Sequence, residues 1–361
     1  MKAASLSQQQ LKLEPLTRAG KWLLESGIQS PGGGVARFYR ADLERHCAIS
    51  TEITGYAAST FQYLYTATGD PAFQEHARRA AHFLARDAWD PDLQNMPFEH
   101  GPEAESMLYF FDCGIIVRGL LAVWRETREE FLLTRAVECG RAMLRDFATA
   151  SEIHPILTLP AKTPLARDWR WSRNPGCYQL KAALAWRELA AITGDREFSR
   201  AYQQHLERSL DDCASFLPGN PTPQRVMDRL HAFSYFLESL LSHLDDDRCA
   251  LAFADGIARV SSLLREISPV FARSDVYAQL LRVRLWGAGT LPLDTEAARH
   301  EAETLVTFQM TSDDPRIDGG FSFGTLDGQL IPHINPVSTA FAIQALHMWH
   351  ARVLPPLGAL I

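Results

Sequence analysis

Two acidic residues occupy nearly equivalent places at the starts of two otherwise apolar segments. Glu52 opens EITGYAASTFQYLYTATGD, and Asp112 is the second residue of FDCGIIVRGLLAVWRETRE. A carboxylate at the start of an apolar helix costs free energy unless it is paired, and burial beside a cleft raises its pKa. Two such carboxylates suit glycoside hydrolysis, with Glu52 as the candidate acid and Asp112 as the candidate base. The alternative is a pair of helix-start carboxylates that are stabilised by exposed amides and the helix dipole.

A histidine lies inside a later apolar segment. His231 begins the run HAFSYFLE, in which Tyr235 and Glu238 share its helical face. A histidine in a pocket accepts a proton or binds a sugar hydroxyl. His231 with Tyr56 or Tyr235 would therefore serve a sugar epimerase or a uronate lyase. A hydrogen-bonded core histidine is the alternative interpretation.

The segment from Asp168 to Pro175, DWRWSRNP, is rich in tryptophan and arginine. Flat aromatic faces stack on sugar rings, and arginine binds carboxylates through two parallel hydrogen bonds. The segment is therefore a candidate platform for a glycan, with an acidic glycan as one option. The alternative is a loop packed on its own arginines. Residues of this loop and polar residues near the starts of the apolar segments are together the candidates for substrate binding. They are Tyr56, Trp169, Trp171, Arg173, Asn174, Tyr178, Tyr235, Arg273, His333 and Asn335.

Arg273 has a second interpretation. It lies two positions before Asp275 at the start of the fifth apolar segment. An ion pair between these two side chains is the preferred role, and a contribution to a sugar subsite is the alternative.

These candidates lie on a repeat of paired helical segments with a period of about 57 residues. A helix that is apolar on most faces must be buried on most sides, whereas an amphipathic helix exposes a polar stripe. The alternation therefore predicts an inner ring of helices inside an outer ring. The apolar segments are 52–70, 111–129, 177–195, 226–244, 275–286 and 336–352. The amphipathic segments are 8–26, 71–86, 130–147, 197–216, 248–267 and 295–309.

The expected fold is thus all-α, an (α/α)6 toroid formed by residues 1–361 as a single domain. About six helical pairs and very apolar inner helices favour a closed ring over an open superhelix of repeats. Short β-prone pieces near 153–159 and 320–334 predict hairpins in the loops between helices.

Several stretches resemble a known group of proteins. They are STEITGY at 50–56, FDCG at 111–114, HAFSY at 231–235, and GGFS at 319–322 followed by Asn335. They are similar to the six-hairpin, (α/α)6-toroid superfamily of carbohydrate-active enzymes. That superfamily includes unsaturated glucuronyl hydrolases, N-acylglucosamine 2-epimerases and bacterial toroids associated with polysaccharide metabolism. The resemblance extends from about Leu13 to Trp349 and implies a toroid that acts on a carbohydrate.

Three hypotheses about function follow. The first is a glycoside hydrolase that uses Glu52 and Asp112, and the second is an epimerase or lyase that uses His231. The third is a non-catalytic glycan-binding or scaffold protein, because a toroid offers its concave mouth to binding as readily as to chemistry.

The composition of the chain argues against several classes of binding partner and against a metal or cofactor. The 361 residues include 36 basic and 43 acidic side chains, and the net charge of −7 argues against nucleic acid or an anionic membrane surface. The first twenty residues lack the apolar core of a secretory signal, so we expect a cytoplasmic protein. The six cysteines are scattered without a Cys-x-x-Cys pair, which predicts buried reduced thiols and no structural metal. No cofactor motif is present in the sequence, and none is expected.

Overall fold

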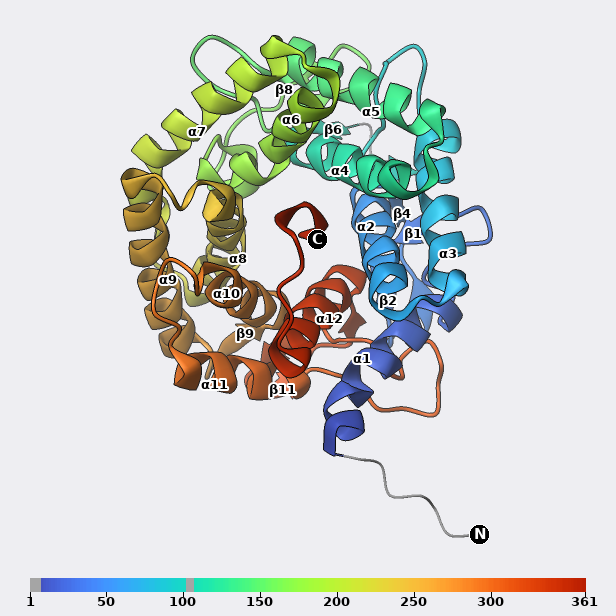
Figure 1. Ribbon diagram of the computed structural model, residues 1–361, viewed down its shortest axis with the longest axis vertical. Coiled ribbons are helices and arrows are strands. Elements are labelled where there is room, and N and C mark those ends of the chain that lie inside the picture. The colour runs from blue at the N-terminus through green and yellow to red at the C-terminus, as the bar shows by residue number, and fades with distance from the viewer. Residues whose placement is uncertain (1–7, 102–106) are drawn as a thin grey trace.

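Helices form two concentric rings in the computed structural model, which describes residues 8–101 and 107–361 (Figure 1). The inner ring consists of α2 (Thr51–Thr68), α4 (Phe110–Thr127), α6 (Leu180–Thr193), α8 (Pro223–Leu240), α10 (Ser274–Gly287) and α12 (Pro336–Ala351). The outer ring consists of α1 (Gln8–Glu25), α3 (Pro71–His82), α5 (Glu130–Ala142), α7 (Arg196–Phe216), α9 (Asp247–Ile267) and α11 (Thr295–Val306). Helix α12 packs on both α1 and α2, which closes the ring. The predicted all-α (α/α)6 toroid is confirmed.

The inner and outer helices differ in how much of their surface is buried. Helix α4 buries nearly every residue from Phe110 to Leu121, whereas α9 buries one stripe that includes Phe253, Val260 and Leu264. This is the arrangement that the alternation of apolar and amphipathic segments requires. No helix in the two described ranges is long and apolar enough to cross a membrane.

The repeated Thr-Gly-Asp turn joins each of two inner helices to the outer helix that follows. Gly69 and Gly194 end α2 and α6 in the left-handed conformation, with φ of 72° and 74°. The next residue caps the following helix: Asp70 accepts a hydrogen bond from Ala72 N, and Asp195 accepts one from Glu197 N. One short motif therefore terminates one helix and starts the next.

Glycines allow neighbouring inner helices to pack with their backbones in close contact. A methyl group at Gly119 would lie 2.5 Å from the carbonyl oxygen of Gly55 on α2. A methyl group at Gly114 would lie 2.4 Å from the carbonyl oxygen of Ala182 on α6. These contacts draw α2, α4 and α6 together and bring the starts of α2 and α4 close to each other.

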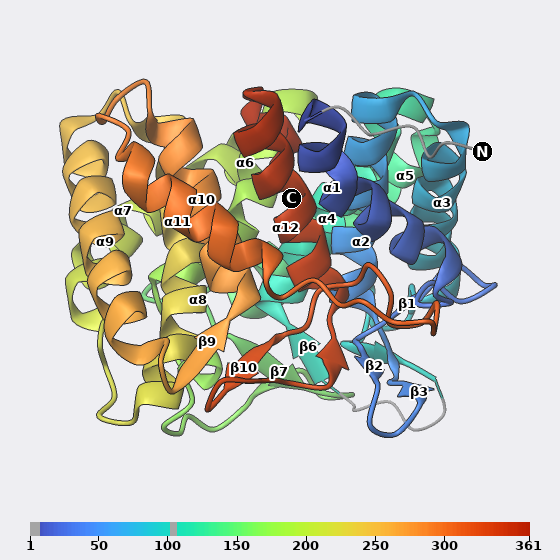
Figure 2. The same ribbon diagram turned by 90° about the horizontal axis from the view of Figure 1, so that it is seen from below.

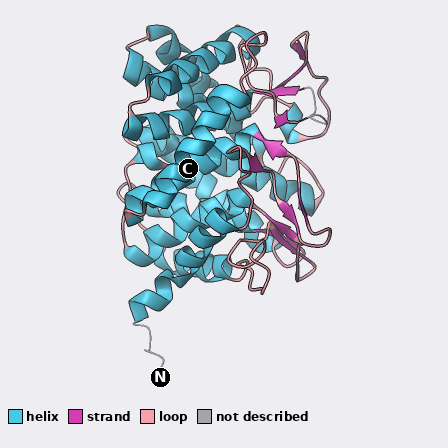
Figure 3. Ribbon diagram, turned by 90° about the vertical axis from the view of Figure 1, so that its right-hand side faces the viewer, coloured by secondary structure: helices cyan, strands magenta, loops and turns pink. Residues whose placement is uncertain are grey.

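Four small antiparallel sheets lie at one end of the ring, which we call the mouth (Figures 2 and 3). The strands pair in the orders β1-β4-β5, β6-β7-β8, β11-β10-β9 and β12-β2-β3. They are β1 (Val35–Ala36), β2 (Tyr39–Arg40), β3 (Arg45–His46), β4 (Ile49–Ser50), β5 (Glu99–His100), β6 (Met107–Tyr109), β7 (Ile156–Thr158), β8 (Thr163–Pro164), β9 (Phe271–Arg273), β10 (Gly324–Leu326), β11 (Gln329–Leu330) and β12 (His333–Ile334).

The strands fix where the inner helices begin. Strands β4, β6, β9 and β12 run directly into α2, α4, α10 and α12. Strand β7 falls in the predicted segment 153–159, and the β10–β11 hairpin falls in 320–334, so strand structure in both segments is confirmed. Strand β12 also falls in 320–334. The strands outside these two segments were not predicted, because each has only two or three residues.

The segment 353–361 follows α12 and turns back into the ring, where its end lies near the axis (Figure 1). Arg118 donates a hydrogen bond to the carbonyl oxygen of Leu360 at 2.8 Å. Lys181 Nζ donates to the Ile361 oxygen at 3.0 Å, and Gln344 donates to the carbonyl oxygen of Ala359 at 2.7 Å. This segment therefore fills the ring from the end opposite the mouth.

All six cysteines are free thiols, as predicted. Four of them are buried, whereas Cys47 and Cys213 are half-buried. In the described part of the chain, no group of three or more His, Cys, Asp or Glu side chains has the arrangement of a metal site.

Candidate active site

Glu52 and Asp112 lie on adjacent inner helices at the mouth. Ser50 caps α2 by accepting a hydrogen bond from Ile53 N, which places Glu52 in the first turn. Asp112 lies in the first turn of α4, directly after β6. Glu52 is partly exposed, whereas Asp112 is 4% exposed and its Oδ2 accepts no hydrogen bond from the described residues.

The two carboxyl groups interact, and the pKa of each lies above the ordinary value for a carboxyl group. Burial raises the pKa of Glu52 to about 7, and the positive charge of Arg37 opposes this shift. Burial, and then the negative charge of Glu52, raise the pKa of Asp112 well above its ordinary value. Two carboxyl groups that repel each other in this way titrate as a pair, so one keeps a proton when the other ionises. The arrangement provides one acid and one base in the same site.

Arg37 belongs to this site, although the sequence analysis did not identify it. It lies between β1 and β2, pairs with Glu99 at 3.0 Å, and stacks 5.0 Å from the centre of the Phe98 ring. Its positive charge opposes the rise that burial causes in the pKa of Glu52 and of Asp112. No spacing pattern links a loop arginine to carboxylates on two helices, so only the fold reveals this contact.

His231 lies on α8 and is held by two residues of α10. Its Nδ1 is 2.8 Å from Gln279 Oε1 and 3.3 Å from Asp275 Oδ2. Burial lowers the pKa of His231 to about 4, so the imidazole is neutral near pH 7. Because both partners are acceptors, Nδ1 carries the proton and Nε2 carries the lone pair. Nε2 makes no hydrogen bond with any described residue, which leaves it available as a base.

Gln279 is a second residue that the sequence analysis missed. It is four positions after Asp275, so both side chains lie on the same face of α10. The four-residue spacing from Asp275 is the sequence pattern that could have identified Gln279 as a residue on the same side of its helix.

Two tyrosines lie beside His231 and the carboxyl pair. Tyr56 and Tyr235 are buried, and the Tyr56 hydroxyl makes no hydrogen bond with the described residues. Burial raises the pKa of both hydroxyls well above the ordinary value, so both remain protonated. The edge of the His231 ring contacts the Tyr235 ring, with 4.6 Å between the ring centres. The tyrosines therefore provide neutral hydroxyl groups next to a neutral base.

A layer of buried charges lies below the tyrosines. Glu238 accepts hydrogen bonds from Lys181 at 2.8 Å and from Arg282. Lys181 and Arg282 also donate to the Ile361 oxygen, at 3.0 and 3.3 Å. This layer separates the mouth from the segment 353–361.

Arg273 forms ion pairs on both sides. It contacts Asp275 at 2.6 Å and Asp228 at 2.7 Å, so the predicted pair with Asp275 is present. Since Asp275 also contacts His231, Arg273 helps to fix the carboxylate that orients the imidazole.

Two candidate residues near α12 differ in their roles. Asn335 caps α12 by accepting hydrogen bonds from Val337 N and Ser338 N at 2.8 and 3.0 Å. His333 lies in β12 and stacks on Phe38, with 4.8 Å between the ring centres. The Asn335 side chain therefore caps a helix. The His333 side chain is half-buried at the mouth.

The loop at 168–175 is held mainly by contacts within itself. Arg170 and Arg173 both pair with Asp168, the latter at 3.2 Å. Asn174 donates to two carbonyl oxygens of the loop at 2.7 Å, and it accepts a hydrogen bond from Tyr178 at 3.1 Å. Since both arginines already have an anionic partner, the loop gives little support to an acidic glycan.

The two tryptophans of this loop differ in exposure. Trp171 packs edge-on against Tyr178, whereas Trp169 is 60% exposed. Arg225 lies 3.8 Å from the centre of the Trp169 ring. A hollow of about 230 Å³ lies between these two residues, Trp171 and Asp228. Because Asp228 pairs with Arg273, this hollow adjoins the network that orients His231.

No protein-family model matches this chain, and no curated protein sequence does either. Its fold is similar to that of a sugar epimerase from a ruminal bacterium, with a TM-score of 0.75, 11% identity, and coverage of 97% of this chain and 100% of that one. It is also similar to cellobiose 2-epimerase from Spirochaeta thermophila, with a TM-score of 0.72, 13% identity, and coverage of 94% and 98%. An unsaturated glucuronyl hydrolase from a Bacillus species gives a TM-score of 0.62, 14% identity, and coverage of 94% and 96%. At these identities the likeness establishes the toroid fold.

Proposed function

We propose that this protein is a carbohydrate-active enzyme that hydrolyses a glycosidic bond, with Glu52 and Asp112 as its acid/base pair. The observation that carries the proposal is the interaction at the mouth between the buried carboxyl group of Asp112 and the partly exposed carboxyl group of Glu52, each with a raised pKa. Glycoside hydrolysis needs one carboxyl group that is protonated and one that is ionised beside the same bond. An interacting pair that shares a proton meets this need.

The roles within the pair follow from access. Glu52 is the more exposed of the two, so it is the residue that reaches the glycosidic oxygen and donates its proton. The pKa of about 7 keeps Glu52 protonated in mildly acidic solution. Asp112, whose Oδ2 has no partner among the described residues, acts as the base for water or as the nucleophile once it has lost its proton. Arg37 stabilises the ionised member of the pair.

The substrate we propose is an oligosaccharide or polysaccharide. The exposed face of Trp169, beside the hollow that it forms with Arg225, suits stacking on a sugar ring. The solved structures of the same fold include sugar epimerases and an unsaturated glucuronyl hydrolase, which supports a sugar as the substrate.

A second candidate function rests on His231. A neutral imidazole with a free Nε2, held by Gln279 and Asp275, suits removal of a proton from a sugar carbon next to a carbonyl group. The hydroxyls of Tyr56 and Tyr235 would donate hydrogen bonds to the oxygen that becomes negative. This arrangement fits an epimerase or isomerase, and with a uronate it fits a lyase.

One experiment separates these reactions. The protein is incubated with neutral and uronic-acid oligosaccharides in water enriched in heavy oxygen, and the products are analysed by mass spectrometry. Hydrolysis places one heavy oxygen at each new reducing end. A parallel incubation in deuterium oxide detects epimerisation, which exchanges one carbon-bound hydrogen without new reducing ends. A lyase product carries a new double bond, and saturable binding without turnover would instead support a glycan-binding protein.

A further inference from the structure

A second cavity lies at the end of the ring opposite the mouth. Its volume is about 490 Å³, and it is bounded by α2, α4 and the segment 353–361. Its lining residues on α2 and α4 come from the middle and the last turns of these helices, whereas Glu52 and Asp112 come from the first turns. The charged layer around Glu238 lies between the two sites. The cavity is therefore separate from the candidate active site, and its size suits a small organic ligand.

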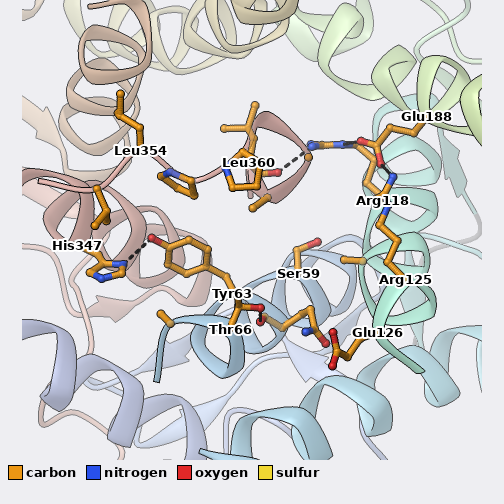
Figure 4. Close-up of a pocket in the computed structure, with 18 residues that line it drawn as sticks. Ser59, Tyr63, Thr66, Arg118, Arg125, Glu126, Glu188, His347, Leu354 and Leu360 are labelled. Carbon is orange, nitrogen blue, oxygen red and sulfur yellow. Dashed lines mark hydrogen bonds and ion pairs between the residues drawn. The ribbon is translucent and has the colours of Figure 1, made fainter. Parts of the chain in front are cut away.

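The polar walls of this cavity are already fixed by hydrogen bonds (Figure 4). The Tyr63 hydroxyl is 2.7 Å from His347 Nδ1. Arg118 and Arg125 both donate to Glu188, at 2.8 and 2.6 Å. A site whose side chains are held in place before binding loses little conformational entropy when a ligand enters.

Gln62 is a buried polar side chain that lines the cavity and lacks one of its partners. It is only 8% exposed, yet its carboxamide oxygen Oε1 accepts no hydrogen bond from the described residues. A buried amide without a partner costs folding free energy, and such groups in native proteins call for an explanation. A ligand in the cavity that carries a hydroxyl group would satisfy this carboxamide.

The charges that line the cavity cancel. Arg118 and Arg125 are balanced by Glu188 and Glu126. Arg118 is also committed to the carbonyl oxygen of Leu360. Much of the remaining wall is apolar and is formed by Ala67, Ala122, Val353, Leu354, Pro355 and Pro356. The lining therefore favours an uncharged molecule with an apolar body over an anion or a cation.

We propose that this cavity is a binding site for an uncharged, largely apolar small molecule that carries a hydroxyl group, and that Gln62 recognises the hydroxyl. The site goes beyond the proposed hydrolase function and does not depend on it. Since residues of 353–361 form one wall, a bound ligand also holds that segment in place.

Fluorescence titration with 2-naphthol tests the proposal, because this probe is uncharged, fluorescent and has one hydroxyl group. We expect saturable binding to the full chain. Naphthalene lacks the hydroxyl group and should bind about tenfold more weakly. The anion 2-naphthoate should bind no better than naphthalene. Tighter binding of 2-naphthoate than of 2-naphthol would overturn the assignment of an uncharged ligand.

Three variants locate the probe. Gln62→Leu keeps the size of the side chain and should reduce the affinity for 2-naphthol to that for naphthalene. Ala122→Trp fills the cavity and should abolish binding of both. Ala258→Trp, on the exposed face of α9, is the matched control and should leave binding unchanged. Thermal denaturation of each variant verifies that it folds.

Two results would overturn the site. One is 2-naphthol binding to Ala122→Trp with unchanged affinity. The other is loss of binding in Trp169→Ala, which would place the probe at the mouth. Because binding is measured without turnover, failure of the hydrolase proposal would not affect this result.

Discussion

At the residue scale, the main feature is the pair of carboxyl groups of Glu52 and Asp112, whose pKa values the fold raises. Glu52 lies at a helix N-terminus, where the dipole favours the charged form, yet burial raises its pKa from 4.5 to about 7. A group whose pKa is higher in the folded than in the unfolded protein stabilises the fold only at low pH. For Glu52 that contribution is complete below about pH 4.5 and is lost as the pH rises to about 7.

Glu52→Gln should therefore raise stability while it removes the proton donor. We expect the free energy of unfolding at pH 7.5 to increase by about 2 kcal/mol, because the neutral amide has no charge to desolvate. The difference between the variant and the wild type should vanish near pH 4. Urea denaturation at both pH values measures this. Equal stability of the two proteins at pH 7.5 would contradict the burial of an ionisable Glu52.

His231 should show one tautomer and no titration near neutral pH. Since burial lowers its pKa to about 4, the imidazole stays neutral between pH 5.5 and 8, with the proton on Nδ1. Nitrogen-15 NMR of the histidine side chains measures both properties, and His231→Asn identifies the resonance. A midpoint between pH 6 and 7 would show that Gln279 and Asp275 do not hold a buried neutral ring.

At the scale of elements, the helices could be predicted from the sequence and the strands largely could not. The alternation of apolar and amphipathic segments locates the twelve α-helices of ranges 8–101 and 107–361, and the Thr-Gly-Asp turns mark two of the junctions. Strands of two or three residues contain too few positions for an alternating pattern. Their positions depend on pairing between distant loops, as in the pairing of β12 with β2.

Some residues of the candidate site could be predicted from the sequence, and others could not. Glu52, Asp112 and His231 stand out because each is a polar residue on an apolar helix. Arg37 and Gln279 do not, since a loop arginine and a helical glutamine are ordinary residues until the ring brings them to the site. Asn174 and Asn335 were candidates for substrate binding, but their side chains hold a loop and cap a helix. Sequence patterns identify which residues are unusual for their element, and the fold decides which of them meet.

The packing of α2 on α4 should be sensitive to a single methyl group. Gly119→Ala places a methyl 2.5 Å from the backbone of Gly55, so we expect a loss of about 1 to 3 kcal/mol in the free energy of unfolding. Gly289→Ala is the matched control, because no atom lies within 4 Å of the place that the added methyl group would occupy. Urea denaturation of both variants measures the effect. Equal stability of Gly119→Ala and Gly289→Ala would contradict the close approach of these helices.

At the scale of the whole molecule, the segment 353–361 fills one end of the ring, and the candidate active site lies at the other end. The segment 353–361 accepts hydrogen bonds from Arg118, Lys181 and Arg282, all of which are buried. Lys181 and Arg282 also pair with Glu238, which lies on the same helix as His231 and Tyr235. The carbonyl oxygens of the segment 353–361 therefore help to stabilise the buried positive charges that lie between this segment and the candidate site.

Removal of residues 355–361 should destabilise the ring. We expect a loss of about 3 to 5 kcal/mol, because Arg118, Lys181 and Arg282 each lose one buried acceptor and the buried side chains of Leu360 and Ile361 are removed. Leu354→Ser is the control, since this side chain is 60% exposed and its replacement should cost about 0.5 kcal/mol or less. Urea denaturation compares the two variants. A truncated protein as stable as the control would show that the segment is only loosely held.

The most direct test of the proposed chemistry is turnover by Glu52→Gln and Asp112→Asn on a glycan that the wild-type protein cleaves, read by heavy-oxygen incorporation at the new reducing end. We predict that each variant folds and loses at least about a hundredfold in kcat, while His231→Asn retains more activity than either. Full turnover by both carboxyl variants would contradict the acid/base assignment, and loss of activity only in His231→Asn would transfer the chemistry to the histidine.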